Sequence, residues 1–174
     1  FSENPAEARA AVDTAEKLGK IIQVSQNYRF YPAPRAAQKL RADGAIGEPS
    51  VIEIDFRKWA NDAPKAGHRH YGIAHPLIFD MAIHHFDLIR KITGQEAKTV
   101  YARPLKPSWS KFEQEGAAAI IIEMESGLVV SYRGSWISAG VPTSWAGDWK
   151  IVGESGELRF TSREGGEIGA EGDR

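Results

Sequence analysis

Six short segments rich in β-branched and aromatic residues constrain the fold of this chain more than any other feature. They cover residues 50–58, 99–103, 117–125, 127–135, 149–153 and 157–161. Runs of this kind are typical of strands, and the Glu-Ser-Gly turn that ends at Gly127 joins two of them as a hairpin. Five of the six follow one another without a helical pattern between them. The sequence therefore predicts an α+β fold, with an open mixed, largely antiparallel sheet and helices on one face.

Three other segments place their apolar residues at helical spacing. They cover 5–18, 34–42 and 76–93, and each is followed within two residues by a glycine. The first leads into the apolar run 21–24, which predicts a short strand. A helix that enters a strand through a tight glycine turn is half of a βαβ unit, so this opening is typical of the last crossover of a parallel sheet.

Composition limits the partners. With 174 residues, 42% of them hydrophobic and 26% charged, the chain has the composition of a soluble globular domain, or of one domain and a piece of another. A net charge of −1 argues against nucleic-acid and membrane-surface binding, which leaves a small molecule as the expected partner. The absence of cysteine excludes disulfides and thiolate chemistry and is compatible with a cytoplasmic location. No apolar run approaches the length of a membrane span.

The helical segment 76–93 carries the main candidate site. At about 100° per residue, Asp80, His84 and Asp87 fall within one narrow sector of an otherwise apolar helix, and we call these three residues the polar stripe. An imidazole with acids one turn away can be held in one tautomer for acid/base chemistry near neutral pH. The alternative is that the three groups only satisfy one another inside a core.

His85, the next residue, is predicted to be structural rather than catalytic. It lies about 100° from His84, within the apolar arc of the same helix. A lone histidine in that position is more often a core residue with satisfied hydrogen bonds than a ligand, so we leave it out of the catalytic set.

Three motifs together resemble a known family. They are residues 27–32 (NYRFYP), residues 44–49 (GAIGEP) and the stripe pattern Asp80-x-x-x-His84-x-x-Asp87, in that order and spacing. The chain is similar over nearly its whole length to the Gfo/Idh/MocA oxidoreductases, the relatives of glucose–fructose oxidoreductase and inositol dehydrogenase. The resemblance implies an NAD(P)-dependent enzyme with a Rossmann domain, followed by an α/β domain whose open sheet forms a subunit interface.

The resemblance also implies how the chain is organised. Residues 1–28 would be the residual end of a truncated dinucleotide-binding domain, and 29–174 the substrate-binding and oligomerisation domain. The chain contains no GxGxxG motif, so the main binding site for NAD or NADP is expected upstream of it, together with the family's lysine. The expected protein is a homo-oligomer that transfers hydride between a secondary alcohol of a sugar or cyclitol and nicotinamide.

The same resemblance gives roles to the polar stripe. His84 would accept the proton of the substrate hydroxyl while hydride leaves the same carbon. Asp80 would orient the substrate or the imidazole. Asp87 would support the substrate side of the site or cap a neighbouring backbone group.

Asn27, Tyr28 and Arg29 are candidates for the cofactor side. They follow the predicted strand at 21–24, and ligands tend to lie at the carboxyl ends of strands in α/β sheets. The alternative is that Arg29 pairs with an acid and Tyr28 packs in the core.

The loop between residues 59 and 74 and its two ends supply candidates for the substrate side. Lys58, Trp59 and His75 combine aromatic faces with cationic and hydrogen-bonding groups, as polyol pockets commonly do. A solvated surface loop is the alternative.

Two functions from other classes remain open. His68 and His70 together with the polar stripe have the residue types of a zinc- or manganese-dependent hydrolase, although the helix lacks an HExxH pattern and we assign no metal ligands. The chain could also be a non-catalytic module for sugar binding or dimerisation. Metal analysis and a dehydrogenase assay would separate the three.

Overall fold

A single six-stranded sheet forms the centre of the protein. The structure is a computed structural model that describes residues 2–62 and 69–161, so His68 lies outside the described residues. The strands are β1 (Pro49–Arg57), β2 (Ala97–Leu105), β3 (Ala117–Met124), β4 (Val129–Ser135), β5 (Asp148–Gly153) and β6 (Gly156–Thr161). Their order is β2-β3-β4-β1-β5-β6, and only β1 and β4 run parallel. The predicted open, mixed and largely antiparallel sheet is confirmed.

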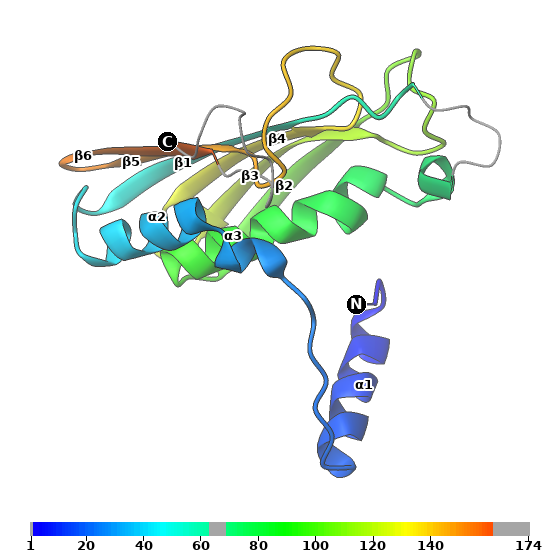
Figure 1. Ribbon diagram of the computed structural model, residues 1–174, viewed down its shortest axis with the longest axis horizontal. Helices are drawn as coiled ribbons and strands as arrows, with labels where there is room; N and C mark the ends of the chain where they lie inside the picture. Colours follow the sequence, from blue (N-terminus) through cyan, green and yellow to red (C-terminus); the bar gives the residue numbers. More distant parts are fainter. Residues whose placement is uncertain (1, 63–68, 162–174) are drawn as a thin grey trace.

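Helices cover one face of this sheet. Figure 1 shows α2 (Pro32–Ala42) and α3 (Ile83–Thr93) side by side on the same face. The short 3-10 helix η1 (Asn27–Phe30) packs against both of them, and a second 3-10 turn, η2 (Arg69–Gly72), precedes the helical segment that leads into α3. We call the opposite face of the sheet, which none of the described helices covers, the outer face. The predicted arrangement of helices on one face is therefore confirmed.

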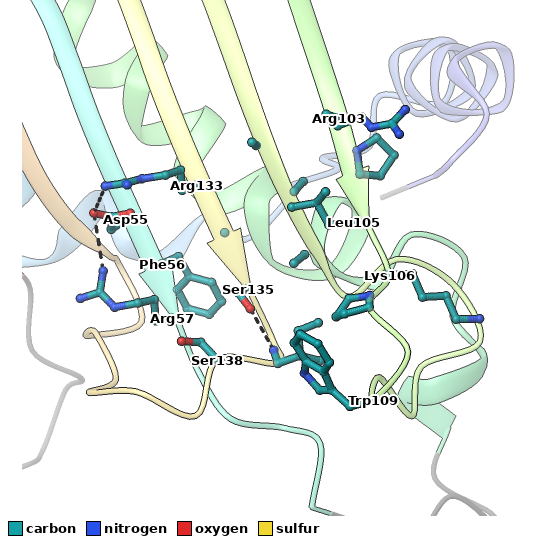
Figure 2. A pocket seen from close by; sticks show the side chains of 17 residues that line it. Asp55, Phe56, Arg57, Arg103, Leu105, Lys106, Trp109, Arg133, Ser135 and Ser138 are labelled. Carbon is teal, nitrogen blue, oxygen red and sulfur yellow. Dashed lines mark hydrogen bonds and ion pairs between the residues drawn. The ribbon is translucent and has the colours of Figure 1, made fainter.

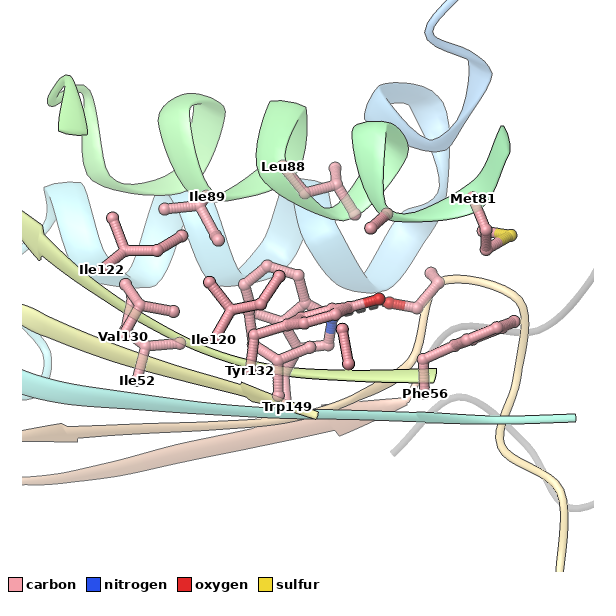
Figure 3. Close-up of a cluster of buried hydrophobic side chains, with 14 of the residues drawn as sticks. Ile52, Phe56, Met81, Leu88, Ile89, Ile120, Ile122, Val130, Tyr132 and Trp149 are labelled. Carbon is pink, nitrogen blue, oxygen red and sulfur yellow. Dashed lines mark hydrogen bonds between the residues drawn. The ribbon is translucent and has the colours of Figure 1, made fainter. Parts of the chain in front are cut away.

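The core lies between the sheet and α3. Alternate residues of the strands point towards the helices, so Ile52, Val130 and Tyr132 are fully buried while their sequence neighbours are not (Figure 3). Leu88 and Ile89 of α3 close the layer from above, with exposures of 0% and 2%. Full burial of an aliphatic side chain stabilises the fold by about 1.5–3 kcal/mol, which is enough to hold α3 in one register on the sheet.

The first helix lies apart from this layer. Figure 1 shows α1 (Pro5–Lys17) away from the sheet, and none of its residues is buried. The predicted strand at 21–24 is wrong: these residues form no strand in the described structure, and the side chain of Ile21 is 96% exposed. A strand needs a partner for its backbone N–H and C=O groups, and no described strand lies beside this segment.

The predicted helix 76–93 forms with one change. Its first part, η3 (Leu77–Ala82), has π-helical bonding, and only the part from Ile83 onwards is α-helical. His75 adopts a positive φ of 43°, and its carbonyl accepts the first hydrogen bonds of the helix. The π segment contains more residues per turn than the α-helix. Asp80 is therefore turned relative to the line that a regular helix predicts.

Among the described residues, no helix combines the length and the apolar character needed to cross a membrane.

Candidate functional site

The three residues of the polar stripe lie on η3 and α3, the helical segments that pack on the sheet. His84 is partly buried, and its Nδ1 lies 2.7 Å from Oε1 of Gln26. The ring of Tyr28 lies on the imidazole, with centroids 4.8 Å apart and planes tilted by 35°. Both contacts come from the segment that enters η1. The imidazole is thus held from two sides by a segment that precedes it by more than 50 residues.

The surroundings of His84 keep the imidazole neutral at pH 7. Burial lowers its pKa below the ordinary value, and the nearby charges of Asp80 and Asp87 raise it to a smaller extent. A neutral imidazole has a free lone pair and can accept a proton. The sequence pattern predicts a general base at this position, and that role stays a prediction.

Asp80 is less closely tied to His84 than the stripe suggests. Its side chain is 40% exposed, and its Oδ2 lies 3.7 Å from Nδ1 of His70 in η2. The side chain that contacts His84 Nδ1 is Gln26. Asp80 thus acts on the imidazole through its charge, and its carboxylate is exposed to solvent.

Asp87 forms the strongest ion pair of the site. Arg29 donates from both Nε and Nη2 to the two carboxylate oxygens, each at 2.6 Å. The bidentate geometry fixes η1 onto α3, and the carboxylate raises the pKa of Arg29. The two residues, predicted on different sides of the site, are therefore partners. Asn27, the first residue of η1, is exposed.

His85 is a core residue with both ring nitrogens occupied. Its Nε2 lies 2.9 Å from the carbonyl oxygen of Trp145, and its Nδ1 lies 3.0 Å from Oη of Tyr132. Since a carbonyl only accepts, Nε2 carries the proton and Nδ1 accepts from the tyrosine hydroxyl. The side chain is fully buried, so the interpretation of His85 as a satisfied core residue is confirmed.

Acid should destabilise the fold through His85. Burial lowers its pKa to about 4, whereas the unfolded chain has the ordinary value near 6.5. The unfolded state therefore binds the proton more readily between these two values, and the stabilisation that is present above pH 6.5 is lost as the pH falls towards 4. We expect a loss of about 3 kcal/mol across this range. Urea unfolding at several pH values would measure it, and a His85→Leu variant should show a weaker dependence over the same range.

The substrate-side candidates have partners of several kinds. Lys58 Nζ lies 4.4 Å from the centroid of the Trp145 ring, whose backbone carbonyl holds His85. Trp59 forms an isolated β-bridge with Ile137, and its side chain is 43% exposed. Lys58 thus contacts the loop that contains Trp145, and the side chain of Trp59 is accessible to solvent.

His75 lies shortly before η3, the helical segment that leads into α3. Its Nδ1 is 2.8 Å from Oε2 of Glu115, and its ring also contacts Phe79. A backbone hydrogen bond of Glu115 itself is the main cause that lowers the pKa of its carboxyl group, and the hydrogen bond with His75 lowers it further. His75 thus links the helix start to the segment before β3.

A pocket lies elsewhere in the described structure, on the outer face at the carboxyl end of β1 and β4. Figure 2 shows this open pocket of about 870 Å³ beside the strands. Its charged and aromatic lining includes Arg57, Arg103, Lys106, Trp109 and Arg133. None of the residues predicted for the site lines it. Arg57 and Arg133 both contact Asp55, so part of the positive charge there is neutralised.

Sequence reasoning missed two residues of the site region. Gln26 precedes the NYRFYP motif directly, and its neutral side chain gives no signal of a role next to a histidine. Glu115 lies in a polar loop 40 residues from its partner His75. Only the position of Gln26, directly before three candidate residues, could have suggested it.

Among the described residues, no group of three or more His, Cys, Asp or Glu side chains is arranged to hold a metal ion.

The fold and the site together define an α+β domain in which a helix on an open sheet carries a neutral imidazole beside carboxylates. Residues 34–159 match the GFO/IDH/MocA C-terminal domain. The chain therefore belongs to the Gfo/Idh/MocA family, and the resemblance seen in its motifs is confirmed.

Similar proteins agree with this assignment. The chain is 31% identical to the uncharacterized oxidoreductase YrbE of Bacillus subtilis, covering 71% of this chain and 36% of that protein. It is 28% identical to D-apiose dehydrogenase of Paraburkholderia graminis, covering 74% and 33%. A crystal structure of an oxidoreductase from Agrobacterium radiobacter, in complex with NAD+, L-tartaric acid and magnesium, has a TM-score of 0.80 and 26% identity, covering 93% and 47%. The chain spans less than half the length of each.

Proposed function

We propose that this chain is the substrate domain of an NAD(P)-dependent oxidoreductase. The protein would transfer hydride between a secondary alcohol carbon of a sugar or cyclitol and nicotinamide, with His84 as the proton acceptor. The observation that carries the proposal is the partly buried, neutral imidazole of His84 next to Asp80 and Asp87, in a chain of this family. Relatives that act on a sugar and bind NAD+ support the substrate and cofactor classes.

The residues of the chain supply the acid/base part of the reaction. Oxidation of an alcohol removes a proton from oxygen and a hydride from carbon, and nicotinamide supplies the hydride acceptor when bound. A neutral His84 can take the proton from the hydroxyl oxygen, while the exposed carboxylate of Asp80 can accept a hydrogen bond from a second substrate hydroxyl. Asp87, neutralised by Arg29, would fix the helix rather than contact substrate.

The residues around η1 fit the cofactor side only in part. Asn27 is exposed and offers both a donor and an acceptor to a nicotinamide edge. Arg29 is already bound to Asp87, so it is not a free phosphate ligand. Tyr28 is buried between Tyr31 and His84 and would shape the site rather than bind the cofactor. We therefore assign only Asn27 to direct cofactor contact.

An assay of hydride transfer in the full-length protein tests the proposal. The protein would be incubated with NAD+ or NADP+ and a panel of sugars and cyclitols, and nicotinamide reduction followed by its absorbance. Turnover of at least one polyol supports the dehydrogenase. No turnover with either cofactor would leave a sugar-binding or dimerisation module. Stoichiometric zinc or manganese in the purified protein would favour the hydrolase instead.

We also propose that the outer face of the sheet mediates homo-oligomerisation. On β2 and β3 it exposes Tyr101 and Ile121, with 71% and 45% of their surfaces accessible. These two residues lie opposite each other in the strand pairing, so they form one apolar patch. A second copy of the chain would remove this patch from water.

Ile121→Glu should weaken such an oligomer. A buried, unpaired carboxylate at a symmetric interface costs several kcal/mol and occurs once in each copy. Sedimentation velocity of the full-length protein should show a smaller species for Ile121→Glu than for Val141→Glu, a control on an exposed loop. An unchanged sedimentation coefficient for Ile121→Glu would argue that the subunits meet elsewhere, or not at all.

A further inference from the structure

Gln26 makes the one hydrogen bond that the described structure gives to the imidazole of His84. The two atoms, Oε1 of Gln26 and Nδ1 of His84, are 2.7 Å apart. The backbone of Gln26 is fixed as well, because its carbonyl accepts from the Arg29 N–H at the start of η1. The side chain is therefore presented to His84 by a hydrogen-bonded turn rather than by a free chain end.

An amide oxygen at this position decides where the imidazole proton lies. A neutral imidazole carries one proton, on either Nδ1 or Nε2, and the nitrogen without it accepts hydrogen bonds. Since Gln26 Oε1 only accepts, the proton of His84 is on Nδ1. Nε2 then keeps the lone pair.

We propose that Gln26 is a positioning residue that holds His84 with its proton on Nδ1, so that Nε2 is the atom that accepts the substrate proton. The inference rests on the proposed function for the proton transfer, but the tautomer itself can be measured without any activity. A neutral amide suits this role because it orients the ring as a carboxylate would, but adds no charge that would favour the protonated imidazole.

Several charged and titratable groups surround the imidazole from the elements packed around it. They are Asp80 and Asp87 on its own helix, Arg29 and Tyr28 on η1, the adjacent His85, and His70 on η2, which lies next to Asp80. Arg29 offsets the charge of Asp87, and His85 is neutral. A carboxylate placed at position 26 would thus add a charge in direct contact with Nδ1, whereas the existing carboxylates act from a greater distance.

Nuclear magnetic resonance of the full-length protein with 15N-labelled histidine reports the tautomer directly. The ring signals of His84 can be assigned by their loss in His84→Gln. In the native protein we expect the pattern of a protonated Nδ1 and an unprotonated Nε2. In Gln26→Met, which keeps the chain length but removes the acceptor, we expect a mixture of tautomers.

Gln26→Glu tests the effect of a charge at the same position. It keeps the acceptor and adds a charge, so we expect the Nδ1–H tautomer to persist and the titration of His84 to move to higher pH. The pH profile of kcat/KM should move in the same direction. Gln26→Met should lower kcat by about 10- to 100-fold, because the reacting nitrogen is no longer held in place. Gln23→Glu and Gln23→Met, on an exposed residue of the same segment, are matched controls and should change neither readout.

Three results would overturn the inference. One is a native His84 protonated on Nε2, the second is a tautomer that does not change in Gln26→Met, and the third is a Gln26→Glu titration equal to that of Gln23→Glu. If the tautomer behaves as expected but no polyol is oxidised, the proposed function fails while the positioning role of Gln26 stands.

Discussion

His84→Ala should lower the kcat of the full-length protein for its best polyol by about 10²- to 10⁴-fold, the usual contribution of a positioned general base. The reason is that His84 is the one imidazole of the polar stripe, and its partly buried ring is neutral at pH 7. The neighbouring His85 cannot replace it, because both of its ring nitrogens are occupied. Steady-state assays against nicotinamide reduction would measure the change.

The pH profile of kcat/KM distinguishes a variant that has lost its general base from one whose structure is damaged. In the native protein kcat/KM should fall on the acid side as His84 becomes protonated, at a pH below the ordinary histidine pKa, because burial lowers the pKa of this group. That acid limb should disappear in His84→Ala. Lys91→Ala, two turns further along α3, is the control and should keep both rate and profile. Turnover of His84→Ala near the native value would rule out the proposed role.

Gly134→Val should destabilise the fold by about 2–4 kcal/mol, the largest stability change we expect from one substitution. Gly134 lies on β4, between β3 and β1, beneath the ring of Tyr132. A Cβ at this position would lie 2.6 Å from Oη of Tyr132 and 2.9 Å from Cδ2 of Leu77. The tyrosine would have to move, and its hydroxyl would lose the hydrogen bond to His85. Overpacking of a core costs about 1–3 kcal/mol, and a buried hydrogen bond about 1 kcal/mol more.

Urea unfolding at constant m-value would measure this loss. Gly140→Val is the matched control: Gly140 is exposed, and the nearest atom to an added Cβ is Ser138 Oγ at 3.8 Å. It should change the free energy of unfolding by less than about 0.5 kcal/mol. Equal stabilities of the two variants would mean that Tyr132 can leave its place above Gly134 at little cost. The link from β4 through Tyr132 to His85 would then contribute little to holding α3.

The strands and the site helix were predictable because their signals are local. Alternation along 117–125 and 127–135 depends on a period of two residues, and the stripe on 76–93 depends on a period near 3.6. Both patterns remain visible in a single sequence whatever the rest of the chain does. Family motifs added the expected class of chemistry, and the match over residues 34–159 confirms the family.

The failures have an equally physical origin. The run 21–24 has the composition of a strand, but a strand forms only beside a partner, and composition says nothing about partners. The π-helical turn at Leu77–Ala82 follows hydrogen bonds that propensity does not encode. As a result, Asp80 is displaced from the line on which sequence spacing places it.

The sequence alone therefore determines which polar residues the helix carries and on which face they lie, because helical periodicity places His84 and Asp87 on one side of α3. The partners of those residues are not. Gln26 contacts His84, and Arg29 contacts Asp87, each across 58 residues of chain. His85 likewise depends on Tyr132 and on a carbonyl 60 residues away. Such contacts exist only once the sheet has brought distant segments together. They occupy both ring nitrogens of His85, whereas in the described structure only Nδ1 of His84 has a hydrogen-bond partner.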